Sequence, residues 1–206
     1  MSTEAVPCAK IELSYLQKVL QRISTVPQTT IAKIEGFARG GGHEFALACD
    51  MRFAARGKAK FMQMKVGMGI LPFGGDSSRM TRQAGLGLAL EIILSARDFG
   101  ADEAEAYGTI NKALDADKIG PYVETLARRI ARFPAASIEA CKRTAYASID
   151  LSIEEALNEE AYWLYQATSQ TPAIKRFTIA DESGIQNDIA NQRNFNDALI
   201  GIQEIT

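Results

Sequence analysis

Apolar residues near the start of the chain recur every three or four positions, as they do on one face of an α-helix. They are Leu13, Leu16, Val19, Leu20 and Ile23. The pattern predicts an amphipathic helix over residues 11–24, which ends before Val26 and Pro27 because a residue that precedes proline disfavours the helical conformation. A β-prone run over residues 29–34 follows, and it predicts the first strand.

The segment after this strand alternates between short elements of different kinds. Three consecutive glycines at residues 40–42 precede an apolar run over 44–49 that has helical character. Two short runs, 50–54 and 59–61, are predicted to be strands joined by a polar turn at 56–58. The order strand, glycine turn, helix, strand is typical of an α/β layer with crossover connections.

The second half of the chain has a mainly helical pattern. A glycine-rich loop within residues 67–80 leads into predicted helices over 79–84 and 86–95. Further helices are predicted over residues 102–107, 119–132, 135–149, 153–168 and 185–202, with Pro134 and Pro172 as breaks. Because apolar stripes on such helices need a partner, the C-terminal third is predicted to pack on a neighbouring subunit.

The composition changes this picture little and indicates an ordinary folded protein. Of 206 residues, 47% are hydrophobic and 23% are charged, and the formal net charge is -2. These values differ from those of basic chains that coat nucleic acid and of charge-rich chains that stay disordered. A chain of this length is predicted to form one domain. Because the net charge is close to zero, we expect no nucleic acid as partner. Because no apolar stretch reaches about 18 residues, we expect no membrane as partner.

The cysteines and the N-terminus bear on the compartment. Cys8, Cys49 and Cys141 lie far apart without CxxC spacing, which argues against a disulfide framework and against a zinc site. The first ten residues contain no apolar core of signal-peptide length. We therefore expect a protein that is not secreted and that resides in the cytoplasm or in an organelle matrix, such as that of the peroxisome or mitochondrion.

The glycine run at residues 40–42 is the first candidate for chemistry. A helix N-terminus carries unpaired N–H groups and a partial positive charge, so glycines there allow an oxyanion to approach the backbone. Glu44 follows in the first turn of the same predicted helix. A carboxylate beside an oxyanion cradle is suited to moving protons next to a carbonyl. The structural alternative is a tight strand-to-helix turn with an acid favourably placed in the first helical turn.

Three blocks in this order resemble the enoyl-CoA hydratase/isomerase (crotonase) superfamily, from about residue 11 to about residue 170. They are "GGGHEFALACD", the P-x-x-G-x-x-x-R block at Pro72, Gly75 and Arg79, and the A-x-x-x-G-x-[IV]-N run that ends at Asn111. The resemblance implies an α/β fold, a crotonase-like spiral of ββα repeats with a helical C-terminal trimerisation region. It divides the chain into a core at 1–115, whose N-terminal layer is missing, and a helical region at 116–206.

The resemblance also implies an activity and a set of site residues. The family acts on acyl-CoA thioesters through a stabilised enolate, as homotrimers or hexamers, and the coenzyme A thioester is the substrate, with no cofactor or metal expected. Gly41 matches an oxyanion donor and Glu44 a catalytic carboxylate. The expected substrate-binding positions are Gly40, Gly42, His43, Met64, Met68, Leu71, Pro72, Phe73 and Gly75. Three of these keep a structural alternative: His43, the only histidine, as a packing or hydrogen-bonding residue, and the two methionines as core residues.

The family's second carboxylate is absent at the expected place. The segment "FMQMKVGMGILPF" contains no acid, and Lys65, or else Met64, occupies the matching position. Hydration of an enoyl thioester divides its proton transfers between two carboxylates, whereas one carboxylate suffices for a double-bond shift. The sequence therefore predicts isomerase-like or lyase chemistry rather than classical hydration. Lys65 either pairs with Glu44, which would weaken Glu44 as a base, or points to solvent.

Two further departures leave alternatives open. Asp76 replaces a family glycine, and it is interpreted either as an N-cap of the following helix or as a replacement acid at the pocket wall. Only about ten residues precede the first predicted helix, which indicates either a shortened chain or a naturally short relative. Besides the acyl-CoA enzyme, the sequence is therefore compatible with a diverted fold that acts on a non-CoA substrate, for example as a cyclase, and with a non-catalytic partner subunit.

Overall fold

The computed structural model describes residues 12–184, 189 and 193–202. Three features of the sequence lie outside the described residues. They are Cys8, Ile11 at the start of the predicted N-terminal helix, and part of the helix predicted over 185–202. The helices in the described part are α1 (Tyr15–Thr25), α2 (Gly41–Ala48), the 3-10 helix η1 (Lys65–Met68), α3 (Asp76–Ala84), α4 (Leu86–Ser95), α5 (Ala101–Ala106), α6 (Ile119–Ile130), α7 (Ala135–Ala147), α8 (Ile153–Thr168), α9 (Thr171–Glu182) and α11 (Phe195–Gly201). The strands are β1 (Ile31–Ile34), β2 (Phe37–Arg39), β3 (Met51–Ala55), β4 (Lys60–Met62), β5 (Phe99–Gly100) and β6 (Lys112–Leu114).

The described strands form two small sheets that α2 joins. Strands β1, β3 and β6 run parallel in that order, with Ile31 opposite Met51. Strands β2 and β4 are parallel, with Phe37 opposite Lys60, and β5 pairs with β4 in the antiparallel sense. The chain passes from β2 of one sheet through α2 to β3 of the other, so the N-terminus of α2 directly follows the end of β2.

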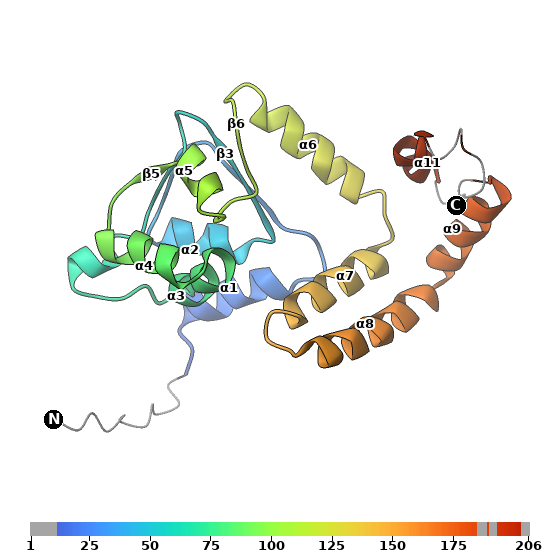
Figure 1. Ribbon diagram of the computed structural model, residues 1–206, viewed down its shortest axis with the longest axis horizontal. Coiled ribbons are helices and arrows are strands. Elements are labelled where there is room, and N and C mark those ends of the chain that lie inside the picture. The colour runs from blue at the N-terminus through green and yellow to red at the C-terminus, as the bar shows by residue number, and fades with distance from the viewer. Residues whose placement is uncertain (1–11, 185–188, 190–192, 203–206) are drawn as a thin grey trace.

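Helices α2 and α5 pack against these sheets, α6 packs over β1 and β3, and the later helices continue beyond the sheets. In Figure 1, α2 lies below the strands, with α1 and α3 packed against it, and α6 to α9 follow the right-hand side as a helical arm. The main buried cluster lies between α2, β4 and α4 and includes Leu47, Phe61 and Ile92. Met80 is fully buried in this core. No helix in the part of the chain that the structure describes has both the length and the apolar character needed to cross a membrane.

Local chemistry explains where several elements begin. Ser14 and Gln17 form a capping box at the start of α1, so the helix begins at Tyr15 rather than at residue 11. Helix α3 begins at Asp76, three residues before the predicted start, and Gly75 is its N-cap. The interpretation of Asp76 as the N-cap is therefore wrong. Helix α9 begins at Thr171 with Pro172 in its first turn, a position where proline costs no hydrogen bond, so Pro172 does not act as a break.

Candidate functional site

The turn between β2 and α2 shapes the start of the site. Gly40 has φ 50° and ψ -114°, a conformation that favours glycine, and its N–H donates to the carbonyl of Met62 over 2.9 Å. Helix α2 then begins at Gly41. Gly41 and Gly42 are exposed, and a Cβ added to either would meet no atom within 4 Å. The glycine face at the start of α2 is therefore open, and the first N–H groups of a helix have no partner within the helix, which is the arrangement that an oxyanion site requires.

Glu44 is fully buried in the first turn of α2, and its two carboxylate oxygens have different surroundings. Oε1 accepts a hydrogen bond from the N–H of Gly74 over 2.7 Å and lies 2.6 Å from Nζ of Lys65. Oε2 has no hydrogen-bond partner among the described residues. One oxygen is thus held in place by the protein, while the other keeps its capacity to accept a proton.

Lys65 is directed to this carboxylate and not to solvent. It begins η1, it is only 9% exposed, and its Nζ lies 4.2 Å from the centre of the Phe73 ring. The ammonium group is therefore enclosed between a carboxylate and an aromatic face. Met64 precedes η1, and its terminal carbon lies 3.9 Å from a Cβ built on Gly40, so its side chain borders the glycine turn.

Gly74 was not predicted from the sequence, yet it determines how closely the following loop approaches Glu44. A Cβ on Gly74 would lie 2.7 Å from the carboxylate of Glu44 and 2.9 Å from a methyl group of Leu20. Gly75 has φ 106°, and a Cβ there would lie 2.1 Å from Nη1 of Arg79. The glycine pair that follows Pro72 and Phe73 is the sequence signal for this contact, because glycines are retained where backbone must come very close to another group.

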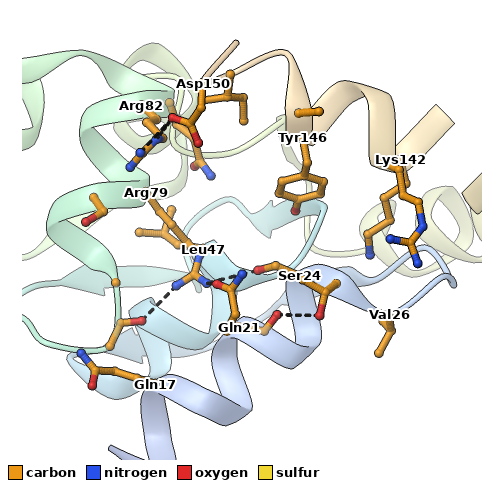
Figure 2. Close-up of a pocket in the computed structure, with 18 of the residues that line it drawn as sticks. Gln17, Gln21, Ser24, Val26, Leu47, Arg79, Arg82, Lys142, Tyr146 and Asp150 are labelled. Atoms are coloured by element: carbon orange, nitrogen blue, oxygen red, sulfur yellow. Dashed lines mark hydrogen bonds and ion pairs between the residues drawn. The ribbon is translucent and has the colours of Figure 1, made fainter. Parts of the chain in front are cut away.

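Arg79, the last residue of the second motif, ties this loop to α1. Nη1 donates to the carbonyl of Gly74 over 3.0 Å, and Nη2 donates to Oγ of Ser24 over 3.2 Å. Figure 2 shows Arg79 directed toward Gln21 and Ser24. Burial lowers the pKa of the Arg79 guanidinium, although not enough to remove its charge in ordinary buffers. Arg79 therefore supports the backbone that holds Glu44.

His43 and Asp76 form a separate buried pair. Nδ1 of His43 lies 2.9 Å from Oδ2 of Asp76, and Nε2 of Gln63 donates to the same oxygen. The His43 ring packs edge-on against Phe61 and Phe99. No hydrogen bond or ion pair joins Asp76 to Glu44 or Lys65, so the structure does not bring Asp76 into the carboxylate site. His43 is in the hydrogen-bonding and packing environment that was its structural alternative, and Gln63 had no signal in the sequence.

The remaining predicted positions lie on the loop from η1 to α3. Met68, Leu71 and Phe73 are exposed, whereas Pro72 is buried and Gly75 is half-buried. Val66 and Ile70 are exposed on the same loop. We call these five exposed residues the apolar rim: Val66, Met68, Ile70, Leu71 and Phe73. The apolar rim includes the aromatic ring that contacts Lys65, so it borders the enclosed ion pair.

A cavity of about 950 Å³ lies on the side of the loop that faces α1, α3, α7 and α8. Its lining includes Leu71, Gly74, Arg79 and Tyr146. In Figure 2, Tyr146 and Lys142 descend from α7 above the α1 residues, and Arg82 meets Asp150 at one end. This cavity therefore borders the loop that contacts Glu44.

Two other motif residues hold the fold around the site. Asp50 accepts hydrogen bonds from the N–H of Thr30 over 2.7 Å, from Nζ of Lys142 over 2.8 Å and from the hydroxyl of Tyr146 over 3.0 Å. It thereby fastens α7 to the start of β1. Asn111 accepts a hydrogen bond from the N–H of Arg52 over 2.7 Å. These polar residues stabilise element contacts and lie outside the carboxylate site.

The residues that the structure describes contain no group of three or more histidine, cysteine, aspartate or glutamate side chains placed to hold a metal ion. The charged groups at the site are a base, Glu44, and an ammonium group, Lys65. Together with the exposed amides of α2, they form a constellation suited to moving protons beside a developing oxyanion.

Comparison with known proteins identifies the family that the three motifs indicated. The sequence profile described as enoyl-CoA hydratase/isomerase matches residues 8–182. The chain belongs to this enoyl-CoA hydratase/isomerase family. The predicted membership of the crotonase superfamily is thus confirmed, and so is the crotonase-like α/β fold with a helical C-terminal region.

Several family members are similar to the chain over part of their length. Crotonyl-CoA hydratase of Syntrophomonas wolfei subsp. wolfei is 37% identical over 145 residues, which cover 70% of this chain and 55% of that protein. Mitochondrial methylglutaconyl-CoA hydratase of Homo sapiens is 40% identical over 120 residues, which cover 58% of this chain and 35% of that protein. The chain spans about half the length of the curated relatives it matches.

Solved structures show the same partial coverage. A probable enoyl-CoA hydratase/isomerase from Mycobacterium abscessus superposes with a TM-score of 0.75 and 30% identity, covering 82% of this chain and 64% of that one. The enoyl-CoA hydratase from Bacillus anthracis gives a TM-score of 0.76 and 27% identity with the same coverage.

Proposed function

We propose that this chain carries the base of an enzyme that shifts protons on an acyl-CoA or related thioester through an enolate. The observation that carries the proposal is the asymmetric environment of Glu44. Oε1 is fixed by Gly74 and Lys65, whereas Oε2 is buried without a partner. A buried acceptor without a partner costs free energy in the protein before substrate binds. That cost is relieved when the oxygen takes a proton from a bound substrate.

The exposed N–H groups at the start of α2 supply the second requirement. Removal of an α-proton from a thioester places negative charge on the carbonyl oxygen. The N–H of Gly41 is available to that oxygen because the helix begins there and open space surrounds the glycine. Loss of one such donor typically costs about 2.7–4 kcal/mol of transition-state stabilisation. The coenzyme A thioester enters as substrate, and the proton chemistry needs no resident cofactor.

The identity of residue 65 favours a double-bond shift over hydration. The chain has Lys65 in contact with Glu44 where a two-carboxylate hydratase needs its second acid. The relatives described above are named hydratases. The proposed double-bond shift therefore rests on the residues of this chain and not on the names of its relatives. Abstraction of a proton at one carbon and delivery to another requires one base and the oxyanion site, the roles proposed here for Glu44 and for the start of α2.

A direct test follows the fate of protons in 3-enoyl-CoA. The wild-type protein and Glu44→Gln are incubated with short and medium 3-enoyl-CoA in D2O, and NMR records deuterium uptake and migration of the double bond. We expect both in the wild type and a loss of about 10²–10⁴-fold in Glu44→Gln, the usual range for a general base. No uptake and no migration in the wild type would contradict the proposal and favour a diverted or non-catalytic protein.

The C-terminal arm supports a proposal on assembly. Helices α8 and α9 expose large apolar side chains, including Leu164, Tyr165 and Phe177. Exposed apolar surface of this kind marks contact with another protein surface. We propose that copies of this chain cover one another's arm in a homotrimer or a hexamer.

A further inference from the structure

Lys65 has unused hydrogen-bonding capacity next to the free oxygen of Glu44. Its Nζ is buried, forms an ion pair with Glu44 Oε1 over 2.6 Å and has no hydrogen-bond partner among the described residues. An ammonium group carries three donors. The pair therefore presents an unfilled acceptor, Glu44 Oε2, and an unfilled donor, Lys65 Nζ, within one enclosed site.

We propose that Lys65 is a catalytic residue that delivers the proton to the far carbon of the substrate, in place of a second carboxylate. The inference rests on the proposed function, because it assigns the second half of the same double-bond shift. Glu44 removes a proton from C2 of a 3-enoyl thioester, and the electron pair of that C–H bond becomes part of a dienolate. Lys65 then gives a proton to C4, the dienolate electrons form the C2=C3 bond, and a 2-enoyl thioester results.

The contact between the two groups completes the cycle. After one turnover the carboxyl group of Glu44 carries a proton and the amine of Lys65 has lost one. A proton returns from the carboxyl group to the amine across their contact, which restores the carboxylate and the ammonium. No oxidant, reductant or further reactant is consumed. The enclosure of Lys65 by Phe73 keeps the ammonium at this position instead of letting it extend to solvent.

Deuterium distinguishes this route from a shuttle by Glu44 alone. In D2O the ammonium of Lys65 exchanges to N–D before the substrate is added. Delivery by Lys65 therefore places deuterium at C4 of the first product formed, while the proton taken from C2 stays on Glu44. A single-carboxylate shuttle instead carries the original proton from C2 to C4. The measurement is the deuterium content at C2 and C4 of product from a single turnover with the protein in excess over substrate, determined by NMR and mass spectrometry.

Variants of Lys65 provide the second measurement. Lys65→Arg keeps the positive charge, but its guanidinium does not lose a proton in proteins. Lys65→Met removes both charge and donor. We expect the ratio of C4 protonation to C2 exchange to fall at least about 10²-fold in both variants, the lower end of the usual range for general acid catalysis. Lys58→Met, on an exposed turn, is the matched control, and its ratio is expected to equal that of the wild type.

The outcomes separate this inference from the proposed function. Protium at C4 in the wild-type product, or a parallel decrease at both carbons in Lys65→Arg and Lys65→Met, would overturn the role of Lys65 while leaving Glu44 as the base. Absence of exchange at both carbons in the wild type would overturn the proposed function, and the role of Lys65 with it.

Discussion

At the scale of single residues, the main feature of the site is that the two carboxylate oxygens of Glu44 have different surroundings. Glu44 is fully buried, yet only one of its oxygens is occupied by described neighbours. Gly74 and Lys65 reach that oxygen from a loop and from η1. The arrangement fixes the orientation of the base before substrate arrives, and pre-organisation of this kind lowers the barrier to proton transfer.

Gly74 offers a test of that orientation. A Cβ at this position would lie 2.7 Å from the Glu44 carboxylate, so Gly74→Ala is expected to push the loop or the base aside. We predict a loss of about 1–3 kcal/mol in unfolding free energy from overpacking and a decrease of about 10²-fold in proton exchange from misplacement. Chemical denaturation and the NMR exchange assay measure the two effects.

Gly36→Ala is the control for this substitution. A Cβ at Gly36 would meet no atom within 4 Å, so both quantities should stay near their wild-type values. Wild-type exchange in Gly74→Ala would contradict the view that the loop positions Glu44.

The sequence indicated the candidate residues of α2 but not the contacts around them. Glu44 and Gly41 follow from glycines that precede an acid at a helix start, a pattern local in sequence. The Gly74 contact joins residues 30 positions apart, and the side chain of Gln63 meets Asp76 across two different elements. No periodicity or motif spacing reports such tertiary contacts, so they were visible only in the folded chain.

At the scale of elements, most helices were predicted from the sequence, whereas helix α9 and three of the very short strands were not. Helices α4 and α8 have the predicted bounds. Strands β2, β5 and β6 have three, two and three residues, which is too short to show an alternating pattern. These short strands exist because neighbouring strands pair with them, a tertiary effect that propensity does not capture.

Docking of α7 onto the core depends on Asp50 and gives a prediction on pH. Burial, together with the nearby Asp50 carboxylate, raises the pKa of Tyr146 to about 12. The unfolded value is about 10, so the folded state binds this proton more tightly. The contribution of Tyr146 to stability is therefore fully present below about pH 10 and is lost as pH rises toward about 12.

We expect the wild type to lose thermal stability more steeply than Tyr146→Phe between about pH 10 and about pH 12. Absorbance titration of tyrosinate should show one late-titrating group that is missing from Tyr146→Phe. Equal slopes for the two proteins, with no late group, would show that the hydroxyl of Tyr146 does not couple α7 to Asp50.

At the scale of the whole molecule, the helical arm that follows the sheets is the feature that calls for a partner. Leu164 is 64% exposed on α8, and Tyr165 beside it is 69% exposed. A single chain leaves this apolar surface in water, whereas association would bury it. The candidate base Glu44 lies on α2 and outside this arm, so the arm is proposed to serve assembly and not the chemistry.

Leu164→Glu tests this view of the arm. The wild type is expected to sediment as three or six copies, and a charge introduced into an apolar interface should shift the population to single chains. Glu154→Gln on the same helix, at an exposed position, is the control and should leave the mass unchanged. A wild-type protein that sediments as a single chain at micromolar concentration would contradict the proposed assembly.

The central claim, that Glu44 removes a proton next to a thioester carbonyl, is tested most directly with a saturated substrate. Butyryl-CoA has no double bond to move, so deuterium uptake at C2 in D2O reports proton removal alone. We predict uptake by the wild type and by Glu35→Gln, which alters an exposed acid, and a decrease of at least about 10²-fold in Glu44→Gln. Uptake by Glu44→Gln at the wild-type rate would contradict the claim.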